Sequence, residues 1–120
     1  MLIRYKKNVE KIAMGLLSFM PGEKDVKTLQ AAIKQYETQD NWNLLLWKEE
    51  EDIVGLIGLV IDDDGTATIQ HLTVNPSFRY QGIGRKMYEE VKSLYADKSV
   101  QANSVIAPFL DKCRKADDKQ

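Results

Sequence analysis

The fold is decided by a stretch in the second half of the chain, which reads Leu72-Thr73-Val74-Asn75-Pro76-Ser77-Phe78-Arg79-Tyr80-Gln81-Gly82-Ile83-Gly84-Arg85-Lys86-Met87. A predicted strand ends at about Asn75, a polar loop with two glycines follows, and a helix begins near Ile83. Glycines allow the backbone to turn successive N–H groups toward one point, and the helix start adds about half a positive charge there. With Arg79 and Arg85 flanking the turn, the stretch predicts a site for a phosphate or pyrophosphate group.

Three phosphate-binding motifs can be compared with this loop. A dinucleotide-binding fingerprint needs a third glycine three residues after Gly84, where the chain has Met87. A P-loop needs Gly-Lys-Ser or Gly-Lys-Thr at its end, which Gly84-Arg85-Lys86 does not provide. The third motif is Arg/Gln-x-x-Gly-x-Gly/Ala after a strand that ends in apolar-x-Val. It fits residues 79–84, which follow the strand end at residues 72–74.

Around this stretch, hydrophobic periodicity predicts an alternation of strands and helices. The expected elements are a strand at 1–6, helices at 8–20 and 24–37, strands at 42–48, 53–61 and 66–75, a helix at 83–95, a strand at 99–102 and a helix that ends near Lys115. This order predicts an α/β fold, an α+β sandwich with a mostly antiparallel central sheet flanked by helices. The 53–61 strand is apolar throughout, so we expect it to be covered on both faces. Gly55 and Gly58 within it indicate a bulge or a closely packed neighbour.

Composition limits the class of protein. The 120 residues correspond to one domain, which we expect at residues 1–115 with a frayed polar tail at 116–120. The formal net charge of −1 argues against a dedicated nucleic-acid-binding protein, which needs a basic surface. No apolar run is long enough to span a bilayer, and no cluster of His, Cys and Asp has the spacing of a metal site. The single cysteine, Cys113, cannot form an internal disulfide. We therefore expect a cytoplasmic protein without a metal and without a membrane or nucleic-acid partner.

From Ile69 to Tyr95 the sequence resembles the GNAT superfamily, the Gcn5-related N-acetyltransferases, through the strand end at 72–74 and the loop at 79–84. The resemblance implies a GNAT-like domain and acetyl-CoA, or another acyl-CoA, as the cosubstrate. The cofactor-binding residues that it implies are Leu72, Val74, Arg79, Tyr80, Gln81, Gly82, Ile83, Gly84, Arg85 and Asn103. In this interpretation Leu72 and Val74 pair their backbone with the pantetheine arm, and the Leu72 amide also polarises the thioester carbonyl.

The same resemblance assigns the remaining cofactor contacts. The amides from Tyr80 to Gly84 hold the pyrophosphate, with Arg79 and Arg85 at its edge, and Asn103 touches the cofactor after the short fifth strand. An ordinary tight turn is the alternative explanation for two glycines taken alone.

The catalytic residues are harder to assign. Strand alternation places Thr66, Thr68, Gln70 and Leu72 on one face of the fourth strand and Ala67, Ile69, His71 and Thr73 on the other. The family's base usually lies on the Leu72 face, where neither Thr68 nor Gln70 can serve. His71 is the only histidine and the candidate catalytic residue, although alternation points it away from that face unless a bulge intervenes. A hydrogen-bonded structural histidine is the alternative.

The last helix departs from the family pattern. Leu110 stands where the family has an acid tyrosine, and the spacing of Cys113 with Ile106 and Phe109 indicates packing rather than a nucleophile. The family's two further strands do not follow this helix, so we expect a fold truncated there, with an exposed sheet edge that a second subunit could cover in a homodimer.

Two functions follow from these observations, and a third, a small α/β interaction protein without a cofactor, would require the glycine loop to be a coincidence. The first is acetyl-CoA-dependent N-acetyl transfer to the amine of a small molecule or a protein, without a covalent enzyme intermediate. The second is a catalytically weak or inactive acyl-CoA-binding module with a regulatory or assembly role. The short chain as a whole also resembles the small GNAT-like proteins encoded with bacterial riboflavin-synthesis genes, a link by gene neighbourhood that identifies no acceptor.

Overall fold

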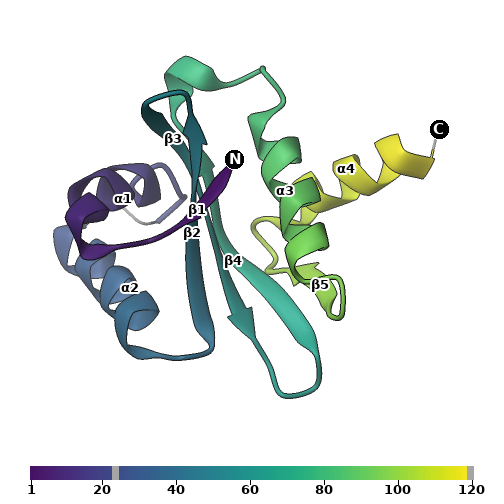
Figure 1. Cartoon of the computed structure of the whole chain (residues 1–120), viewed down its shortest axis with the longest axis horizontal. Helices are drawn as coiled ribbons and strands as arrows, with labels where there is room; N and C mark the ends of the chain where they lie inside the picture. Colours follow the sequence, from purple (N-terminus) through teal and green to yellow (C-terminus); the bar gives the residue numbers. More distant parts are fainter. Residues whose placement is uncertain (23–24, 119–120) are drawn as a thin grey trace.

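The computed structural model describes residues 1–22 and 25–118 and has a single five-stranded sheet at its centre (Figure 1). The strands are β1 (Leu2–Arg4), β2 (Trp42–Glu49), β3 (Asp52–Ile61), β4 (Thr66–Val74) and β5 (Ser99–Ala102). They lie in the order β1-β2-β3-β4-β5. The first four pair antiparallel, and β5 pairs parallel with β4. The predicted α/β sandwich with a mostly antiparallel sheet is therefore confirmed.

Helices cover both faces of the sheet. They are α1 (Glu10–Leu17), α2 (Val26–Thr38), α3 (Ile83–Leu94) and α4 (Ala107–Asp118), and short 3₁₀ turns lie at Lys7–Val9 and Pro76–Phe78. Figure 1 shows α1 and α2 on one side of the sheet and α3 and α4 on the other. The last helix extends three residues beyond the predicted end near Lys115, and residues 119–120 of the expected tail lie outside the described residues. Among the described residues, no helix is both long enough and apolar enough to cross a membrane.

Strand β3 lies between two cores, which explains its uninterrupted apolar sequence. Its even-numbered residue Leu56 packs with the residues of α1 and α2, including Leu17 and Ile33. Its odd-numbered residues Ile57 and Leu59 pack toward α3 and α4. That second core contains Leu45, Ile57, Leu59, Ala67, Ile69, Tyr88, Val91, Val100, Ile106, Leu110 and Cys113. Coverage of both faces of this strand is thus confirmed.

The two glycines of β3 each accommodate a side chain from a covering helix. A Cβ atom at Gly55 would lie 3.0 Å from the Met87 sulfur of α3. A Cβ atom at Gly58 would lie only 2.0 Å from the Tyr36 hydroxyl oxygen of α2. Alanine at Gly58 would therefore force Tyr36 out of its position, so this glycine is required by the close approach of a tyrosine.

A β-bulge in β4 separates His71 from the face of Ala67 and Ile69, while His71 stays on the face opposite Leu72, as predicted. Gly58 is opposite His71 while the next residue of β3, Leu59, is opposite Ile69, so Gln70 is one extra residue in β4. Ile69 packs toward α3 and α4, whereas His71 contacts Tyr36 on α2. The expectation that Ala67, Ile69, His71 and Thr73 share one face is therefore wrong, because the bulge reverses the alternation at Gln70.

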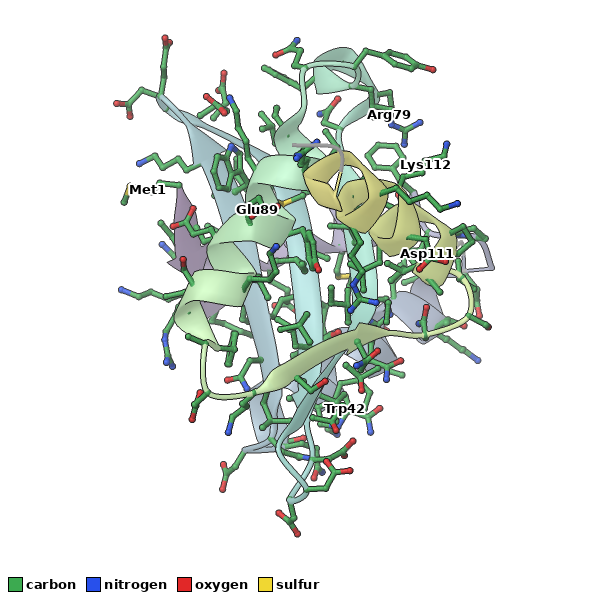
Figure 2. All side chains as sticks on the ribbon, turned by 90° about the vertical axis from the view of Figure 1, so that its right-hand side faces the viewer. Met1, Trp42, Arg79, Glu89, Asp111 and Lys112 are labelled. Atoms are coloured by element: carbon green, nitrogen blue, oxygen red, sulfur yellow. The ribbon has the colours of Figure 1, made fainter. Side chains whose placement is uncertain are left out.

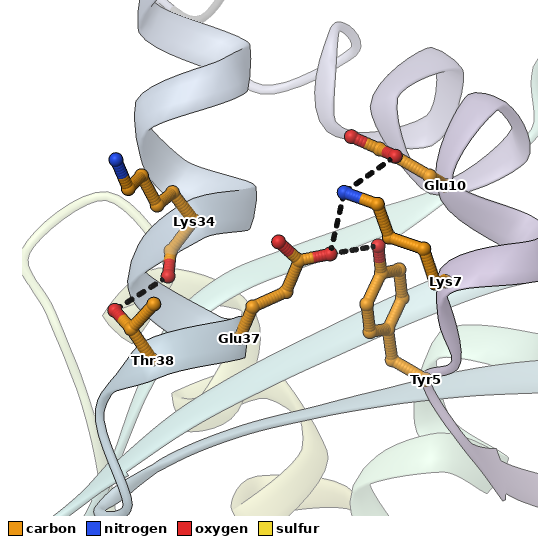
Figure 3. Close-up of polar contacts among 6 residues, drawn as sticks. All are labelled: Tyr5, Lys7, Glu10, Lys34, Glu37 and Thr38. Carbon is orange, nitrogen blue, oxygen red and sulfur yellow. Dashed lines mark hydrogen bonds and ion pairs between the residues drawn. The ribbon is translucent and has the colours of Figure 1, made fainter.

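A polar cluster joins the N-terminal segment to α2 (Figure 3). The Tyr5 hydroxyl donates a 2.8 Å hydrogen bond to Glu37, and the Lys7 ammonium lies 2.9 Å from Glu10 and 3.2 Å from Glu37. The hydrogen bond from Tyr5, followed by the one from Lys7, holds the pKa of the Glu37 carboxyl below its ordinary value. Burial, followed by the hydrogen bond to Glu37, raises the pKa of the Tyr5 phenol. The cluster therefore favours the ionised form of Glu37 in the folded state.

The cluster predicts a pH-dependent contribution to stability. Because the pKa of Glu37 is lowered by folding, its contribution is complete above the ordinary value of 4.5 and is lost as the pH falls through the folded-state value. Glu37→Gln should lower the free energy of unfolding at pH 7 by less than about 1 kcal/mol, and the difference from wild type should shrink toward pH 3. Urea unfolding across this range measures the effect.

Glu51→Gln, in the exposed turn between β2 and β3, is the matched control and should show no comparable trend. A difference between wild type and Glu37→Gln that stays constant from pH 7 to pH 3 would contradict the assigned role of Glu37.

Candidate functional site

A cleft of about 540 Å³ lies between the end of β4, the start of α3 and the start of α4. Its lining residues are Phe19, Met20, Leu72, Thr73, Val74, Phe78, Arg79, Tyr80, Gly82, Ile83, Gly84, Arg85, Val105, Ile106 and Phe109. Eight of the ten residues predicted to bind a cofactor are therefore brought together here: Leu72, Val74, Arg79, Tyr80, Gly82, Ile83, Gly84 and Arg85.

The loop into α3 is shaped by local interactions that the sequence specifies. The Asn75 side chain accepts a 2.9 Å hydrogen bond from the Ser77 amide, which starts the 3₁₀ turn at Pro76–Phe78. Gly82 then adopts a left-handed conformation with φ 77°, which glycine permits without a steric penalty, and α3 begins at Ile83. The first helical hydrogen bond joins the Lys86 amide to the Gly82 carbonyl, so the amides before Lys86 have no acceptor within the helix.

The start of α3 therefore presents backbone N–H groups and the positive end of a helix dipole at the cleft. Gly84 lies in this first turn, and a Cβ atom there would be 3.0 Å from the Phe109 ring of α4. The absence of a side chain at Gly84 thus lets α3 and α4 approach each other at the base of the cleft.

Two side chains of the loop lie at the mouth of the cleft. The Arg79 Nε donates a 3.1 Å hydrogen bond to the Val74 carbonyl, and its guanidinium lies 5.8 Å from the centre of the Phe19 ring. Figure 2 shows Arg79 at the upper end of the molecule, above α4. Tyr80 has a left-handed backbone with φ 66° and a fully exposed side chain. These residues place a fixed cation and an unpacked aromatic ring beside the α3 terminus.

The end of β4 leaves one backbone edge unpaired by any strand among the described residues. Pairing with β5 stops at Ile69 and Ala102, and β3 covers the other edge. The Gln70 carbonyl accepts from the Asn103 side chain and the Val74 carbonyl accepts from Arg79, so both carbonyls point toward the edge that β5 has left. Strand alternation directs the backbone groups of Leu72 to the same edge. An extended ligand could pair there as an additional strand would.

A buried hydroxyl in the cleft has no hydrogen-bond partner among the described residues. It belongs to Thr73, which is 5% exposed and lines the cleft beside Phe19 and Met20. Buried polar groups in folded proteins are nearly always hydrogen-bonded, because an unpaired one costs about 1–3 kcal/mol. The Thr73 hydroxyl is thus a buried polar group beside the cleft whose hydrogen-bonding capacity the described residues leave unused.

Two of the residues predicted to bind a cofactor do not line the cleft. Gln81 lies on the outer side of the loop, in a hollow with Glu49 and Lys86. Asn103 donates to the Gln70 carbonyl at 3.0 Å and accepts from the Ile106 amide at 3.1 Å, so its side chain joins the β4 bulge to the start of α4. The NH2 group and the oxygen of the Asn103 side chain are therefore both hydrogen-bonded within the protein.

His71 lines a second cavity, of about 380 Å³, on the α1 and α2 side of β4. Its lining residues are Met20, Pro21, Thr28, Ala31, Ala32, Gln35, Trp42, Gln70, His71, Asn103 and Val105. This second cavity shares Met20 and Val105 with the first cleft, so the two hollows adjoin across β4. His71 itself is 8% exposed, and its Nδ1 lies 2.5 Å from the Tyr36 hydroxyl.

The position of the expected acid tyrosine lies in the core. Leu110 is 2% exposed and packs with Ile106 and Cys113 beneath α4. Cys113 is buried as well, as its helical spacing predicts. No group of three or more His, Cys, Asp and Glu side chains that could hold a metal ion occurs among residues 1–22 and 25–118.

Sequence reasoning missed two residues that line the first cleft, Thr73 and Phe19, and one that contacts His71, Tyr36. Thr73 was expected to lie on the face opposite Leu72, which gave no reason to connect its hydroxyl with the cleft. Tyr36 has a helical spacing with Ile33 that indicates packing, and only Gly58, a glycine within a strand, hints at its close approach. Phe19 has no signal in the sequence, because its place beside Arg79 depends on how α1 docks on the sheet.

Comparisons with known proteins agree with this architecture. Residues 10–111 match the family model described as the acetyltransferase (GNAT) family. A protein of Bacillus methanolicus, described as an uncharacterized N-acetyltransferase in lysA 3'region, is 56% identical over 113 residues, which are 94% of each chain.

Solved structures show the same fold. The aminoglycoside N-acetyltransferase AAC(6')-Iy in complex with CoA superposes with a TM-score of 0.77 at 16% identity, over 97% of this chain and 84% of that chain. A GNAT family acetyltransferase from Elizabethkingia anophelis with acetyl-CoA bound has a TM-score of 0.64 and 25% identity, over 81% of this chain and 57% of that chain. The chain therefore belongs to the acetyltransferase (GNAT) family, and by that membership it is an N-acetyltransferase.

Proposed function

We propose that the chain transfers an acetyl group from acetyl-CoA, or a related acyl group from another acyl-CoA, directly to an amine of a small molecule or a protein. The observation that carries this proposal is the convergence, in one cleft, of the α3 amides, Arg79, Arg85 and the unpaired edge of β4. A diphosphate next to an extended amide chain matches this combination of groups. The cleft volume of about 540 Å³ is in the usual range for small-molecule sites.

The residues of the cleft fit acetyl-CoA in three places. The first-turn amides of α3, which have no helical acceptor, would hold the pyrophosphate with the two arginines beside it. The Leu72 backbone would pair with the pantetheine arm, and its amide would lie toward the thioester carbonyl. The Thr73 hydroxyl, which has no partner among the described residues, would receive a polar group of the same ligand. Gln81 and Asn103 would act indirectly, by shaping the loop and the bulge.

Bound acetyl-CoA supplies a thioester, an acyl group that an uncharged amine can attack without a covalent enzyme intermediate. The chain has to hold both substrates together and to remove a proton from the amine, which is mostly cationic at neutral pH. We assign the second cavity, which contains His71, to the acceptor amine and call it the acceptor-side cavity. It adjoins the cleft, so His71 is the base in this proposal. A cytoplasmic location is part of the proposal, supported by a single cysteine, Cys113, that is buried in the core.

One observation favours a second function. Leu110, buried at 2% exposure, occupies the place of the family's acid tyrosine, and it cannot protonate a departing thiolate. A chain with weak or no turnover would act as an acyl-CoA-binding regulatory or assembly module. The resemblance to GNAT-like proteins encoded with riboflavin-synthesis genes would then connect acyl-CoA levels with riboflavin metabolism.

Charge reversal at the loop tests the coenzyme site. Arg79→Glu and Gly82→Asp should each weaken binding of CoA at least about tenfold, because each places a carboxylate beside the diphosphate. Isothermal titration calorimetry measures the affinity, and Lys11→Glu on the outer surface of α1 is the matched control. The release of free thiol from acetyl-CoA with a panel of amines measures turnover.

Unchanged CoA affinity in both loop variants would refute the site. If wild type binds acetyl-CoA stoichiometrically but releases no thiol with any amine of a broad panel, the result would refute acetyl transfer and support the acyl-CoA-binding module.

Thr73→Val tests the buried hydroxyl. The free protein should keep its stability or gain up to about 1 kcal/mol, because the hydroxyl has no partner to lose, while the affinity for CoA should fall about three- to tenfold. Thermal unfolding and calorimetry provide the two measurements, and Thr66→Val at the other end of β4 is the control. A CoA affinity equal to that of wild type would show that the ligand does not use this hydroxyl.

We also propose a homodimer formed through the outer edge of β5, which pairs only with β4 among the described strands. Arg114 donates a 2.8 Å hydrogen bond to the Val100 carbonyl on this edge, so part of it is already covered. Sedimentation velocity should show a dimer at micromolar concentration, and Arg114→Ala should increase the dimer fraction by freeing that carbonyl. A monomer in both proteins would eliminate this interface.

A further inference from the structure

A buried tyrosine and histidine form a pair outside the coenzyme cleft. The Tyr36 hydroxyl of α2 lies 2.5 Å from the Nδ1 atom of His71 in β4, and the two residues are 7% and 8% exposed. Their rings meet edge to face, with 5.5 Å between the centres. We infer that Tyr36 is a positioning residue for His71: it fixes the imidazole so that the other ring nitrogen, Nε2, accepts the proton of the acceptor amine. This inference rests on the proposed acetyl transfer.

Three features of the fold hold the two side chains together. The bulge at Gln70 turns His71 to the α2 side of the sheet, away from the core of α3 and α4. Gly58 of β3, the residue opposite His71, leaves the space that the Tyr36 hydroxyl occupies, since a Cβ atom there would lie 2.0 Å from this oxygen. Trp42 of β2 packs against the Tyr36 ring with 5.2 Å between the centres. Residues from three strands thus determine where this hydroxyl lies.

The hydrogen bond at Nδ1 decides what His71 can do. When Nδ1 carries the hydrogen and donates to the Tyr36 oxygen, Nε2 has a lone pair and can act as a base. When the Tyr36 hydroxyl donates to Nδ1, Nε2 carries the hydrogen and cannot accept another one. A base therefore needs the first tautomer, in which the Tyr36 oxygen also stabilises the imidazolium that forms. In other histidine bases too, a hydrogen-bond acceptor at the Nδ1 hydrogen fixes the tautomer and leaves Nε2 able to accept a proton.

The place of His71 suits this step. It lines the acceptor-side cavity with Gln70 and Asn103, and this cavity adjoins the cleft proposed for acetyl-CoA. In the reaction, the amine gives one proton to Nε2, its nitrogen forms a bond to the acyl carbon, and the carbon–sulfur bond breaks. The nitrogen then loses its second proton, which passes through solvent to the thiolate of CoA that leaves with the electron pair, and the imidazolium returns its proton to solvent.

The first test is spectroscopic and does not depend on turnover. His71 is the only histidine in the chain, so the ¹⁵N signals of its ring are unambiguous in untagged protein. Long-range ¹H–¹⁵N spectra of wild type should show the tautomer with the hydrogen on Nδ1, and Tyr36→Phe should convert it to a mixture. Trp42→Phe, which changes the packing around Tyr36 but keeps its hydroxyl, should retain the wild-type tautomer. Wild type with the hydrogen on Nε2, or Tyr36→Phe with unchanged signals, would overturn the inference.

The second test is a kinetic double-mutant cycle with Tyr36→Phe, His71→Gln and the combined variant. Tyr36→Phe should lower kcat at least about tenfold and leave the affinity for CoA unchanged. His71→Gln should lower kcat further. The combined variant should be no slower than His71→Gln, because a residue that acts through His71 has no effect once His71 is gone. Independent losses that multiply would assign Tyr36 a purely structural role and overturn the inference.

The two tests separate the inference from the proposed function. Binding of acetyl-CoA without thiol release would refute acetyl transfer, while the tautomer of His71 in wild type and in Tyr36→Phe would still decide whether Tyr36 orients the ring.

Discussion

The separation of β5 from β4 is the constraint on which the rest of the structure depends. The two strands pair only as far as Ile69 and Ala102, and at that point the Asn103 side chain donates to the Gln70 carbonyl. The same side chain accepts from the Ile106 amide at the start of α4. One amide group thus fixes the bulge in β4, the departure of β5 and the position of α4. Without that departure, β5 would cover the edge of β4 that faces the cleft.

The bulge gives one short strand two different tasks. Before Gln70, Ala67 and Ile69 point into the core beneath α3 and α4. After Gln70, His71 points to the opposite side of the sheet. The Leu72 backbone meanwhile remains on the open edge. The first cleft and the cavity that contains His71 therefore adjoin across β4, with Met20 and Val105 common to both. Direct transfer between two bound substrates requires such an arrangement, because the reacting groups must meet within one enclosed space.

The residues proposed to bind the coenzyme match the family's pattern more completely than the residues proposed for catalysis. The glycine turn, the first turn of α3 and both arginines lie in the cleft, whereas the place of the acid tyrosine belongs to the buried Leu110. Proximity and backbone polarisation of a thioester can act without a side-chain acid, since a thiolate is a good leaving group compared with an alkoxide. In the proposed reaction, removal of the amine proton is therefore the step that a side chain assists, through the Tyr36 and His71 pair.

The sequence by itself determined the features that depend on neighbours along the chain. The helical periodicity, the apolar run of β3, the left-handed turn at Gly82 and the order of the elements all follow from local conformational preference and burial. Only the tertiary structure decided that His71 and Thr73 lie on the opposite side of the sheet from Ala67 and Ile69, because one extra residue at Gln70 reverses the side-chain alternation and leaves no compositional signal. It also decided the partner of His71, since Tyr36 lies thirty-five residues away along the chain and meets it only when α2 docks over Gly58.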